Sequence, residues 1–233
     1  VAHSMGGLVC RAFLQNAARG DDEARACVDT VFTYAAPHNG IEMAGANVPS
    51  WLSAGDANNF NRKRMAEYLD LQDEFKKTGR VDWLPEKKGG FPIDRFFCLI
   101  GTNRTDYEAA RGISRTFAGH GSDGLVKIEN ALVCSWRNGA SATSAAKAFV
   151  YRSHSGVFGI VNSEESYQNL TRFLFGDIRA DLWLDIEDIT LPEKVQKEAD
   201  AGRDVDALYQ IEVLASPRGK LWYLTRRTSE EDS

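Results

Sequence analysis

Apolar runs and amphipathic patterns alternate along the first 177 residues of the chain. Three short apolar runs are typical of strands buried on both faces: 28–36, 94–102 and 146–154. Three longer segments place apolar residues at helical spacing: 5–20, 61–79 and 162–177. This alternation predicts an α/β fold with a mainly parallel sheet and helices on its faces.

Two of the expected strands are separated by a long insert, 41–93, that carries no strand pattern. Within it, 61–79 is expected to form one amphipathic helix that ends at Gly79. The expected inward residues of this helix are Met65, Tyr68, Leu69 and Phe75. In the last of the three helices, Asn162 and Glu165 fit a capping pattern.

The pattern changes after Asp177, where strict alternation over 180–191 predicts a half-buried strand. The segments 207–215 and 220–228 flank the turn sequence "SPRG" and predict a β-hairpin. We expect a polar connection and a frayed acidic tail at 192–204 and 229–233. Residues 178–233 are therefore predicted to be a small antiparallel β extension.

The composition excludes few classes of protein, but it reduces the kinds of partner that we expect. The 28 basic and 33 acidic residues give a net charge of -5, which does not favour nucleic acid or an anionic membrane. No apolar run is long enough to span a bilayer, and no cofactor fingerprint, phosphate loop or metal-ligand spacing is found. The cysteines are widely spaced and mostly in apolar contexts, although a Cys10–Cys27 bridge stays open.

The first residues, "VAHSMGG", place Ser4 between an apolar strand and a helix. A sharp strand-to-helix turn would lift the serine hydroxyl clear of the sheet, and it needs small neighbours such as Ala2, Gly6 and Gly7. The same pattern also fits a serine that caps a helix N-terminus. The motif alone does not decide between a nucleophile and a cap.

Four stretches, in this order along the chain, favour the nucleophile over the helix cap: "AHSMGG", "YAAPHNG", "GSDGLV" and "YRSHSGVFGIVNSEESYQNLTRFLFGD". Together they resemble the second half of an α/β-hydrolase of the lipase/esterase type, over roughly the first three-quarters of the chain. The resemblance implies a catalytic core over 1–177, with 41–93 as its cap or lid insert. It also implies a nucleophile, an acid and a histidine in that order along the chain.

His154 is the favoured base among the four histidines, because it follows a strand and every candidate acid. His3 is expected to point away from Ser4 and to pack beside the turn. His38 is expected to shape the floor of the pocket, where it would contact substrate. His120 lies too close in sequence to the best candidate acid to receive its support.

Asp123 is the favoured acid, since glycines at 119, 121 and 124 free its loop to reach the site. Asp106 is the alternative, nearer the end of its strand. The resemblance supplies most of the preference for Asp123.

The resemblance further implies that the N–H of Met5 forms half of an oxyanion hole and that Trp51, Leu52 and Phe60 line an acyl pocket; packing of the insert onto the core is the alternative. The second oxyanion donor of such enzymes precedes the nucleophile turn. We therefore expect the N-terminal strands to be missing, and the chain to be a fragment that begins halfway through its enzyme.

The sequence thus predicts a serine hydrolase that cleaves carboxylic esters through an acyl-enzyme on Ser4, without cofactor or metal. A small-molecule or lipid acyl ester is the expected substrate, which places the protein in lipid metabolism. An acyltransferase of the same fold and a non-catalytic scaffold domain remain alternatives. The compartment stays open, with the cytoplasm as the default because no signal peptide is visible; a missing N-terminus would have removed one.

Overall fold

The structure is a computed structural model of the 233-residue chain. It describes residues 1–41, 60–86, 90–107, 121–137, 140–179, 181, 183, 185–188, 190–202, 208–215 and 225–232. Of the residues singled out above, Trp51, Leu52 and His120 lie outside this described part.

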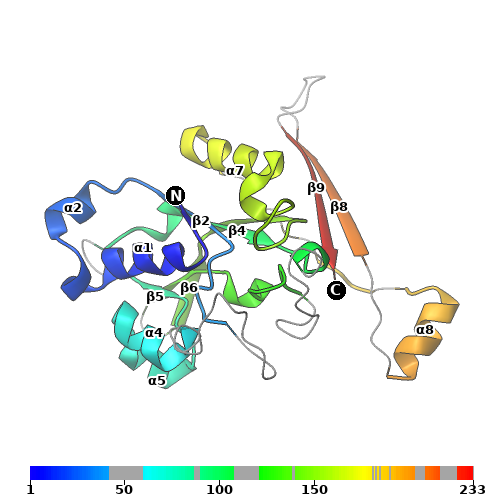
Figure 1. Ribbon diagram of the computed structural model, residues 1–233, viewed down its shortest axis with the longest axis horizontal. Helices are drawn as coiled ribbons and strands as arrows, with labels where there is room; N and C mark the ends of the chain where they lie inside the picture. The colour runs from blue at the N-terminus through cyan, green and yellow to red at the C-terminus, as the bar shows by residue number, and fades with distance from the viewer. Residues whose placement is uncertain are drawn as a thin grey trace.

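The centre of the fold is a four-stranded sheet in which all neighbouring strands are parallel (Figure 1). Its strands, in spatial order, are β1 (Ala2–His3), β2 (Val31–Tyr34), β4 (Phe96–Gly101) and β7 (Ala146–Val150). The spatial order of the strands is the same as their order along the chain. Because all four strands run in one direction, their carboxyl ends lie at the same edge of the sheet. The predicted α/β class with a parallel sheet is confirmed.

Helices cover the two faces of this sheet, as alternation of side chains along parallel strands allows. One face packs its residues with Leu170 and Phe173 of α7 (Glu164–Phe175): Phe32, Tyr34, Leu99, Ala148 and Val150. The other face packs its residues with Leu14 of α1 (Met5–Gln15): Val31, Phe96, Cys98 and Ile100. Figure 1 shows α1 and α7 on opposite sides of the strands.

Shorter helices connect these elements. The remaining early α-helix is α2 (Asp22–Ala26), and the 3-10 helices are η1 (Ala17–Arg19), η3 (Ile93–Arg95), η4 (Ile128–Asn130) and η5 (Ile160–Asn162). The expected helix over 5–20 stops at Gln15, because Asn16 is extended and its side chain accepts from the N–H of Ala18 (2.9 Å). The cap of α7 is Ser163, not Asn162, whose side chain donates to the carbonyl of Gly156.

A second sheet was not predicted. It joins β3 (Trp83–Pro85), β5 (Cys134–Arg137) and β6 (Ala140–Ser144), with β3 parallel to β5 and β5 antiparallel to β6. The expectation that 41–93 holds no strand is wrong, because β3 has three residues and is too short to show alternation. The fully buried Arg11 side chain fixes this sheet to α1 by donating to the carbonyls of Val81 and Trp83.

The described part of the insert also contains helices, but the single expected helix is two. They are α4 (Arg62–Leu69) and α5 (Gln72–Thr78), separated by Asp70, whose φ of 58° is left-handed. Met65 and Leu69 are buried against Leu8 and Ala12 of α1, as the pattern predicted. The insert therefore packs onto the core through α4.

The C-terminal part is partly as expected. Strands β8 (Leu208–Ala215) and β9 (Thr225–Asp232) form an antiparallel pair, as expected of two strands in this region. The described second strand is 225–232 instead of 220–228, and the expected turn, 216–219, lies outside the described residues. However, β9 extends through 229–232, where a frayed tail was expected, and α8 (Glu193–Asp200) occupies the expected polar connection. The described residues of 180–191 form no strand, and Trp183 is 94% exposed.

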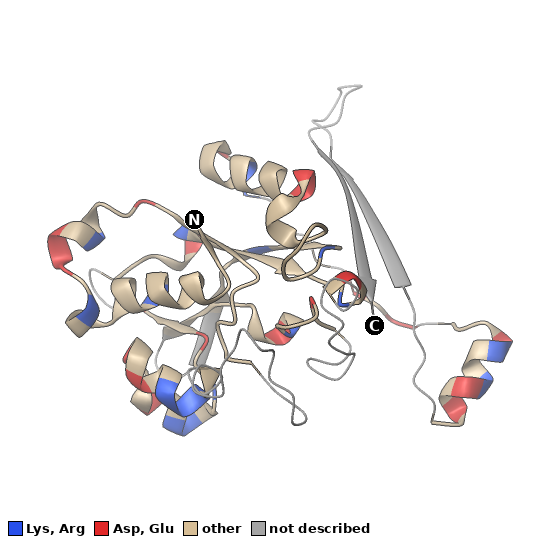
Figure 2. Ribbon diagram, in the orientation of Figure 1, with Lys and Arg blue, Asp and Glu red and all other residues tan. Residues whose placement is uncertain are grey.

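Three further observations bear on composition. None of the four cysteines, all of which lie in the described part of the chain, is in a disulfide, so the Cys10–Cys27 bridge is not formed. None of the helices in the described part of the chain combines the length and apolar character needed to cross a membrane. Acidic and basic side chains are intermixed on helices such as α4, α5 and α8 (Figure 2).

Candidate active site

Ser4 occupies the turn between β1 and α1 with a φ of 53° and a ψ of -127°. Such a backbone conformation is strained for a residue with a Cβ and is held here by two bonds. The N–H of Ser4 donates to the carbonyl of Tyr34 (2.9 Å), and the N–H of Gly7 donates to the carbonyl of Ser4 (3.0 Å). Ser4 stands at the cap position of α1, but its hydroxyl makes no capping bond within the described residues.

The small residues near Ser4 differ in how strictly the packing of the turn requires them. A Cβ at Gly7 would lie 2.5 Å from the Cβ of Ala36 and 3.2 Å from Cγ2 of Thr33, so α1 and β2 approach too closely for any side chain there. A Cβ at Gly6 would lie 3.4 Å from the Cβ of Ala2, an ordinary contact. The close packing of the turn therefore depends on Gly7 more than on Gly6.

The hydroxyl of Ser4 instead faces His154, which follows the carboxyl end of β7. Oγ of Ser4 lies 3.0 Å from Nε2 of His154, and Nδ1 of His154 lies 2.9 Å from Oδ2 of Asp123. A carboxylate can only accept, so Nδ1 carries the proton and Nε2 accepts from Ser4. The three side chains thus form one directed chain of hydrogen bonds.

Asp123 is held in place on all sides. Its Oδ1 accepts from the N–H groups of Leu125 (3.0 Å) and Val126 (2.7 Å), and its carbonyl accepts from the N–H of His154 (2.9 Å). Both the Asp123 and the His154 side chains are almost fully buried. Two backbone N–H donors and the imidazole N–H thus satisfy the hydrogen-bonding capacity of this buried carboxyl group.

The alternative acid lies elsewhere. Oδ2 of Asp106 accepts from Nδ2 of Asn103 (2.6 Å), within the turn that follows β4. The structure brings Asp123, not Asp106, to His154.

Gly101, at the end of β4, was missed by sequence reasoning. A Cβ at this position would lie 2.9 Å from the Cβ of Asp123 and 2.5 Å from the carbonyl oxygen of Arg152. The absence of a side chain therefore lets the loops that carry Asp123 and His154 meet. The only sequence signal was a glycine at the end of an apolar run, which is common for other reasons.

Two aromatic rings flank His154. The ring centroid of His3 is 5.0 Å away, and that of Tyr107 is 6.1 Å away in an edge-on arrangement. Nε2 of His3 also lies 2.9 Å from the carbonyl oxygen of His154. Burial, and then the charge of His154, lower the pKa of His3.

His38 does not occupy the place that was expected for it. Its side chain has no exposed surface, so it cannot contact substrate in this structure. Oγ1 of Thr33 donates to the carbonyl of Phe97 (3.2 Å) and lies 3.1 Å from Nε2 of His38, which therefore is the donor. Burial, and then the charge of Arg11, hold the pKa of His38 well below its usual range. His38 packs beneath α1 because Gly7 leaves room for its ring.

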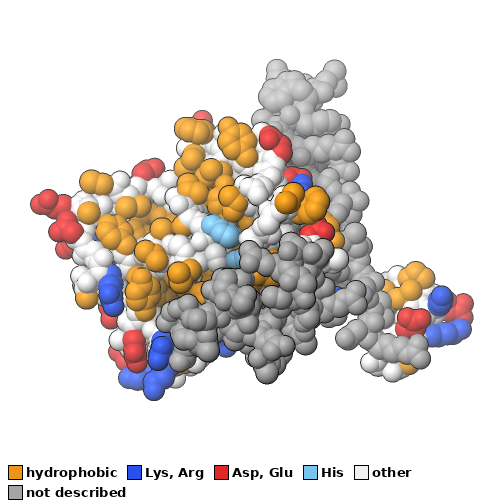
Figure 3. Space-filling view, in the orientation of Figure 1, with side chains coloured by type: hydrophobic (Ala, Val, Ile, Leu, Met, Phe, Trp, Pro, Cys, Tyr) orange, Lys and Arg blue, Asp and Glu red, His pale blue; other side chains and the backbone are white. Residues whose placement is uncertain are grey.

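An apolar groove of about 300 Å³ runs along α1 beside the serine turn. It is lined by Met5, Leu8, Val9, Phe60, Arg64 and Tyr68. Phe60 is one of the lining residues, but it is only 5% exposed and packs in a core cluster with Leu8 and Met65, which was the alternative expected for it. Met5 and Val9 are about half exposed. In the space-filling view, apolar side chains surround the visible histidine surface (Figure 3).

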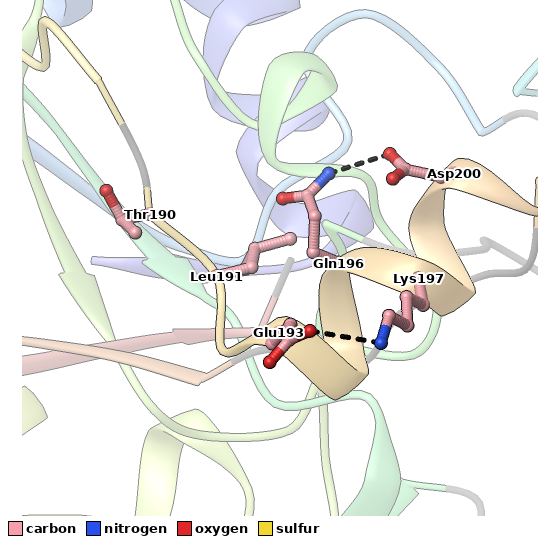
Figure 4. Close-up of a pocket in the computed structure, with 6 residues that line it drawn as sticks. All are labelled: Thr190, Leu191, Glu193, Gln196, Lys197 and Asp200. Carbon is pink, nitrogen blue, oxygen red and sulfur yellow. Dashed lines mark hydrogen bonds and ion pairs between the residues drawn. The ribbon is translucent and has the colours of Figure 1, made fainter.

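Other parts of the described chain offer little chemistry. A hollow on α8 is lined by polar residues that pair with one another, Gln196 with Asp200 (2.8 Å) and Lys197 with Glu193 (3.1 Å) (Figure 4). These are exposed contacts one turn apart on a helix. No group of three His, Cys, Asp or Glu residues among the described residues is placed to hold a metal ion.

Comparisons with known proteins add no assignment. No protein-family model matches this chain, and neither the curated proteins nor the solved structures give a match.

Proposed function

We propose that this protein is a serine hydrolase of carboxylic esters, with an α/β-hydrolase fold of the lipase/esterase type. One observation carries the proposal: Ser4, His154 and Asp123 form a directed hydrogen-bond chain at the carboxyl edge of a parallel sheet. A serine hydroxyl is a weak nucleophile unless a positioned base takes its proton. This chain of bonds supplies the base and the group that orients it.

In the proposed reaction, Oγ of Ser4 bonds to the ester carbonyl carbon while its proton moves to Nε2 of His154. The π electrons of the carbonyl move to its oxygen, which the N–H of Met5, in the first turn of α1, would stabilise. The bond from carbon to the alcohol oxygen then breaks, and that oxygen takes the proton from Nε2. Water repeats the sequence and releases the carboxylic acid and Ser4.

Asp123 makes this proton path possible. By accepting from Nδ1, it fixes the tautomer in which Nε2 has a free electron pair, and it stabilises the imidazolium that forms. The two N–H donors from Leu125 and Val126 hold the carboxyl group in position.

The apolar groove beside Met5 supports a hydrophobic acyl or alcohol group as part of the substrate. Met5, next to the nucleophile, and Val9, just over one helical turn along α1, supply the exposed apolar surface of this groove. Burial of methylene groups there would contribute about 0.8 kcal/mol each. A lipid or another hydrophobic ester therefore fits better than a strongly polar one.

The experiment is covalent labelling of the chain with a fluorophosphonate probe, which bonds to an activated serine with loss of fluoride. We expect labelling that mass spectrometry maps to Ser4 and that Ser4→Ala abolishes, with Ser163→Ala as the matched serine control. Absence of labelling would favour a non-catalytic scaffold domain. An assay of a short-chain p-nitrophenyl ester with added alcohol then separates hydrolysis from acyl transfer by its products.

A further inference from the structure

We propose that His3 is a positioning residue, whose Nε2–H holds the main chain of His154 at the serine turn while the catalytic cycle runs. The inference rests on the proposed function, since it assigns a role within that reaction. It concerns a residue that sequence patterning places merely beside the nucleophile.

Every polar group of His154 makes a hydrogen bond, and each bond goes to a residue far away in the sequence. Asp123 takes the backbone N–H and the side-chain Nδ1–H, with both distances at 2.9 Å. Ser4 faces Nε2 at 3.0 Å. The remaining group, the carbonyl oxygen, lies 2.9 Å from Nε2 of His3.

The direction of the last bond is fixed by chemistry. A carbonyl oxygen has no proton, so Nε2 of His3 must be the donor. This bond does not require a charged imidazole, and burial together with the nearby His154 lowers the pKa of His3 and so favours its neutral form. The charged group that faces His3 besides His154 is Asp123.

His3 is unsuited to be the base itself. Its Nε2 is committed to a carbonyl, and the carboxylate of Asp123 is bonded to His154. Its contribution therefore acts through His154.

The serine turn holds His154 by two contacts, one from Ser4 and one from His3, which are consecutive residues. The Ser4 contact cannot last through the cycle, because the acyl-enzyme replaces the Oγ–H bond with an ester and leaves nothing to donate to Nε2. During that interval the His3 bond is the contact that continues to join the turn to His154.

Among the described residues, the loop that carries His154 makes few other contacts that would fix its position relative to the serine turn. Beyond His154 the chain turns sharply at Gly156, whose φ is 99°, and exposes Val157 and Phe158 to solvent. Bonds such as Ile160 N–H to the carbonyl of Ser153 (2.8 Å) hold the loop to itself rather than to the turn. A displacement of about 1 Å in a catalytic group can cost on the order of a hundredfold in rate.

Three variants separate the hydrogen bond from the ring. Gln places an amide N–H near the position of imidazole Nε2, Asn carries the same amide one bond short, and Leu has no donor. We expect His3→Gln to retain the rates of the unchanged chain. We expect His3→Asn and His3→Leu to lower kcat for p-nitrophenyl butyrate about tenfold or more.

The loss should fall on deacylation, in which Ser4 no longer holds His154. When deacylation limits the rate, kcat/KM reports acylation, so kcat/KM and the rate of fluorophosphonate labelling should change much less than kcat. A KM that falls together with kcat would support the proposal. Full kcat in His3→Leu, or a loss in His3→Gln equal to that in His3→Leu, would overturn it.

A spectroscopic measurement tests the bond without any turnover. In the proton NMR spectrum, the Nδ1–H of His154 bonded to Asp123 should give a downfield signal. We expect the signal to persist in His3→Gln and to broaden through exchange with water in His3→Leu and His3→Asn. If the unchanged chain neither turns over esters nor labels at Ser4, the proposed function fails, while the NMR pattern still supports or overturns the role of His3. An unchanged signal in all three variants would overturn it.

Discussion

Oγ of Ser4 and Nε2 of His154 lie 3.0 Å apart, although 150 positions separate the two residues in the chain. The parallel sheet makes this contact possible, because β1 and β7 end at the same edge with β2 and β4 between them. Loops that leave that edge can converge over it, and ligand sites of parallel α/β sheets are found at such edges. The proposed chemistry therefore depends on the order of the strands as much as on the three residues.

Replacement of Asp123 by Asn tests the directed chain. The amide nitrogen can donate to Nδ1, which favours the wrong imidazole tautomer and leaves Nε2 protonated. We expect ester hydrolysis to fall by about three to four orders of magnitude while the fold persists. Initial rates with p-nitrophenyl butyrate measure the effect.

Asp106→Asn is the matched control, because Asp106 bonds within its own turn. We expect it to keep near-normal rates. Equal losses in the two variants would contradict the assignment of Asp123.

Gly7→Ala tests the packing of α1 on β2. The added Cβ would meet the Cβ of Ala36 at 2.5 Å, so either the helix or the strand must move. Overpacking of this kind typically costs about 1–3 kcal/mol in the free energy of unfolding. Urea denaturation measures the change.

Gly6→Ala serves as the comparison, since its Cβ would make an ordinary contact with Ala2 at 3.4 Å. We expect a change in the free energy of unfolding of less than about 1 kcal/mol. A larger loss at Gly6 than at Gly7 would show that the turn is packed differently.

Gly101→Ala addresses the site without changing any of its three side chains. The new Cβ would press on the Cβ of Asp123 and on the carbonyl of Arg152, and so displace the loop that orients His154. We expect ester hydrolysis to fall by about ten- to a hundredfold. Gly79→Ala is the control: its Cβ would meet no atom within 4 Å, and its left-handed φ of 69° confines the strain to the C-cap of α5. We expect this variant to keep the full rate in the same assay; a full rate in Gly101→Ala would contradict the prediction.

The features that could be predicted from the sequence are those that a short stretch of residues displays. Strands β2, β4 and β7 were found from their apolar runs; β2 and β4 are buried almost throughout, whereas Lys147 of β7 is exposed. Ser4 and His154 were selected from their positions next to strands, and Asp123 from the glycines of its loop and from the motif order. Strand β3 was missed because three residues ending in Pro85 are too few to show a period. The insert was divided wrongly because the break at Asp70 is a single left-handed residue within an otherwise helical pattern.

The errors around the site share a physical cause. His38 was assigned to the pocket from its place after a strand. In the structure its ring instead packs beneath α1, in the space left by the missing side chain of Gly7. His3 was expected only to pack beside the turn, because nothing local shows that the carbonyl of His154 lies within its reach. Contacts between residues so far apart depend on tertiary packing, which a single sequence does not display.

The last prediction concerns acid and the buried His38. Burial and the charge of Arg11 keep the pKa of His38 well below 6.5 in the folded chain, while unfolding restores its usual value. The unfolded chain therefore binds a proton first as the pH falls, so stability is full above about pH 6.5 and declines below it. One such histidine changes the free energy of unfolding by at most about 1.4 kcal/mol per pH unit.

Urea denaturation at pH 7.5 and at pH 5.5 measures this decline. His38→Gln is the matched variant, because its amide can donate to Thr33 Oγ1 in place of Nε2–H but does not titrate. We expect the variant to lose less stability than the unchanged chain between these two values. His3, whose pKa is also lowered, acts in the same direction in both proteins and cancels in the comparison. Equal losses would mean that His38 takes up its proton without unfolding, and that its buried site accepts the charge.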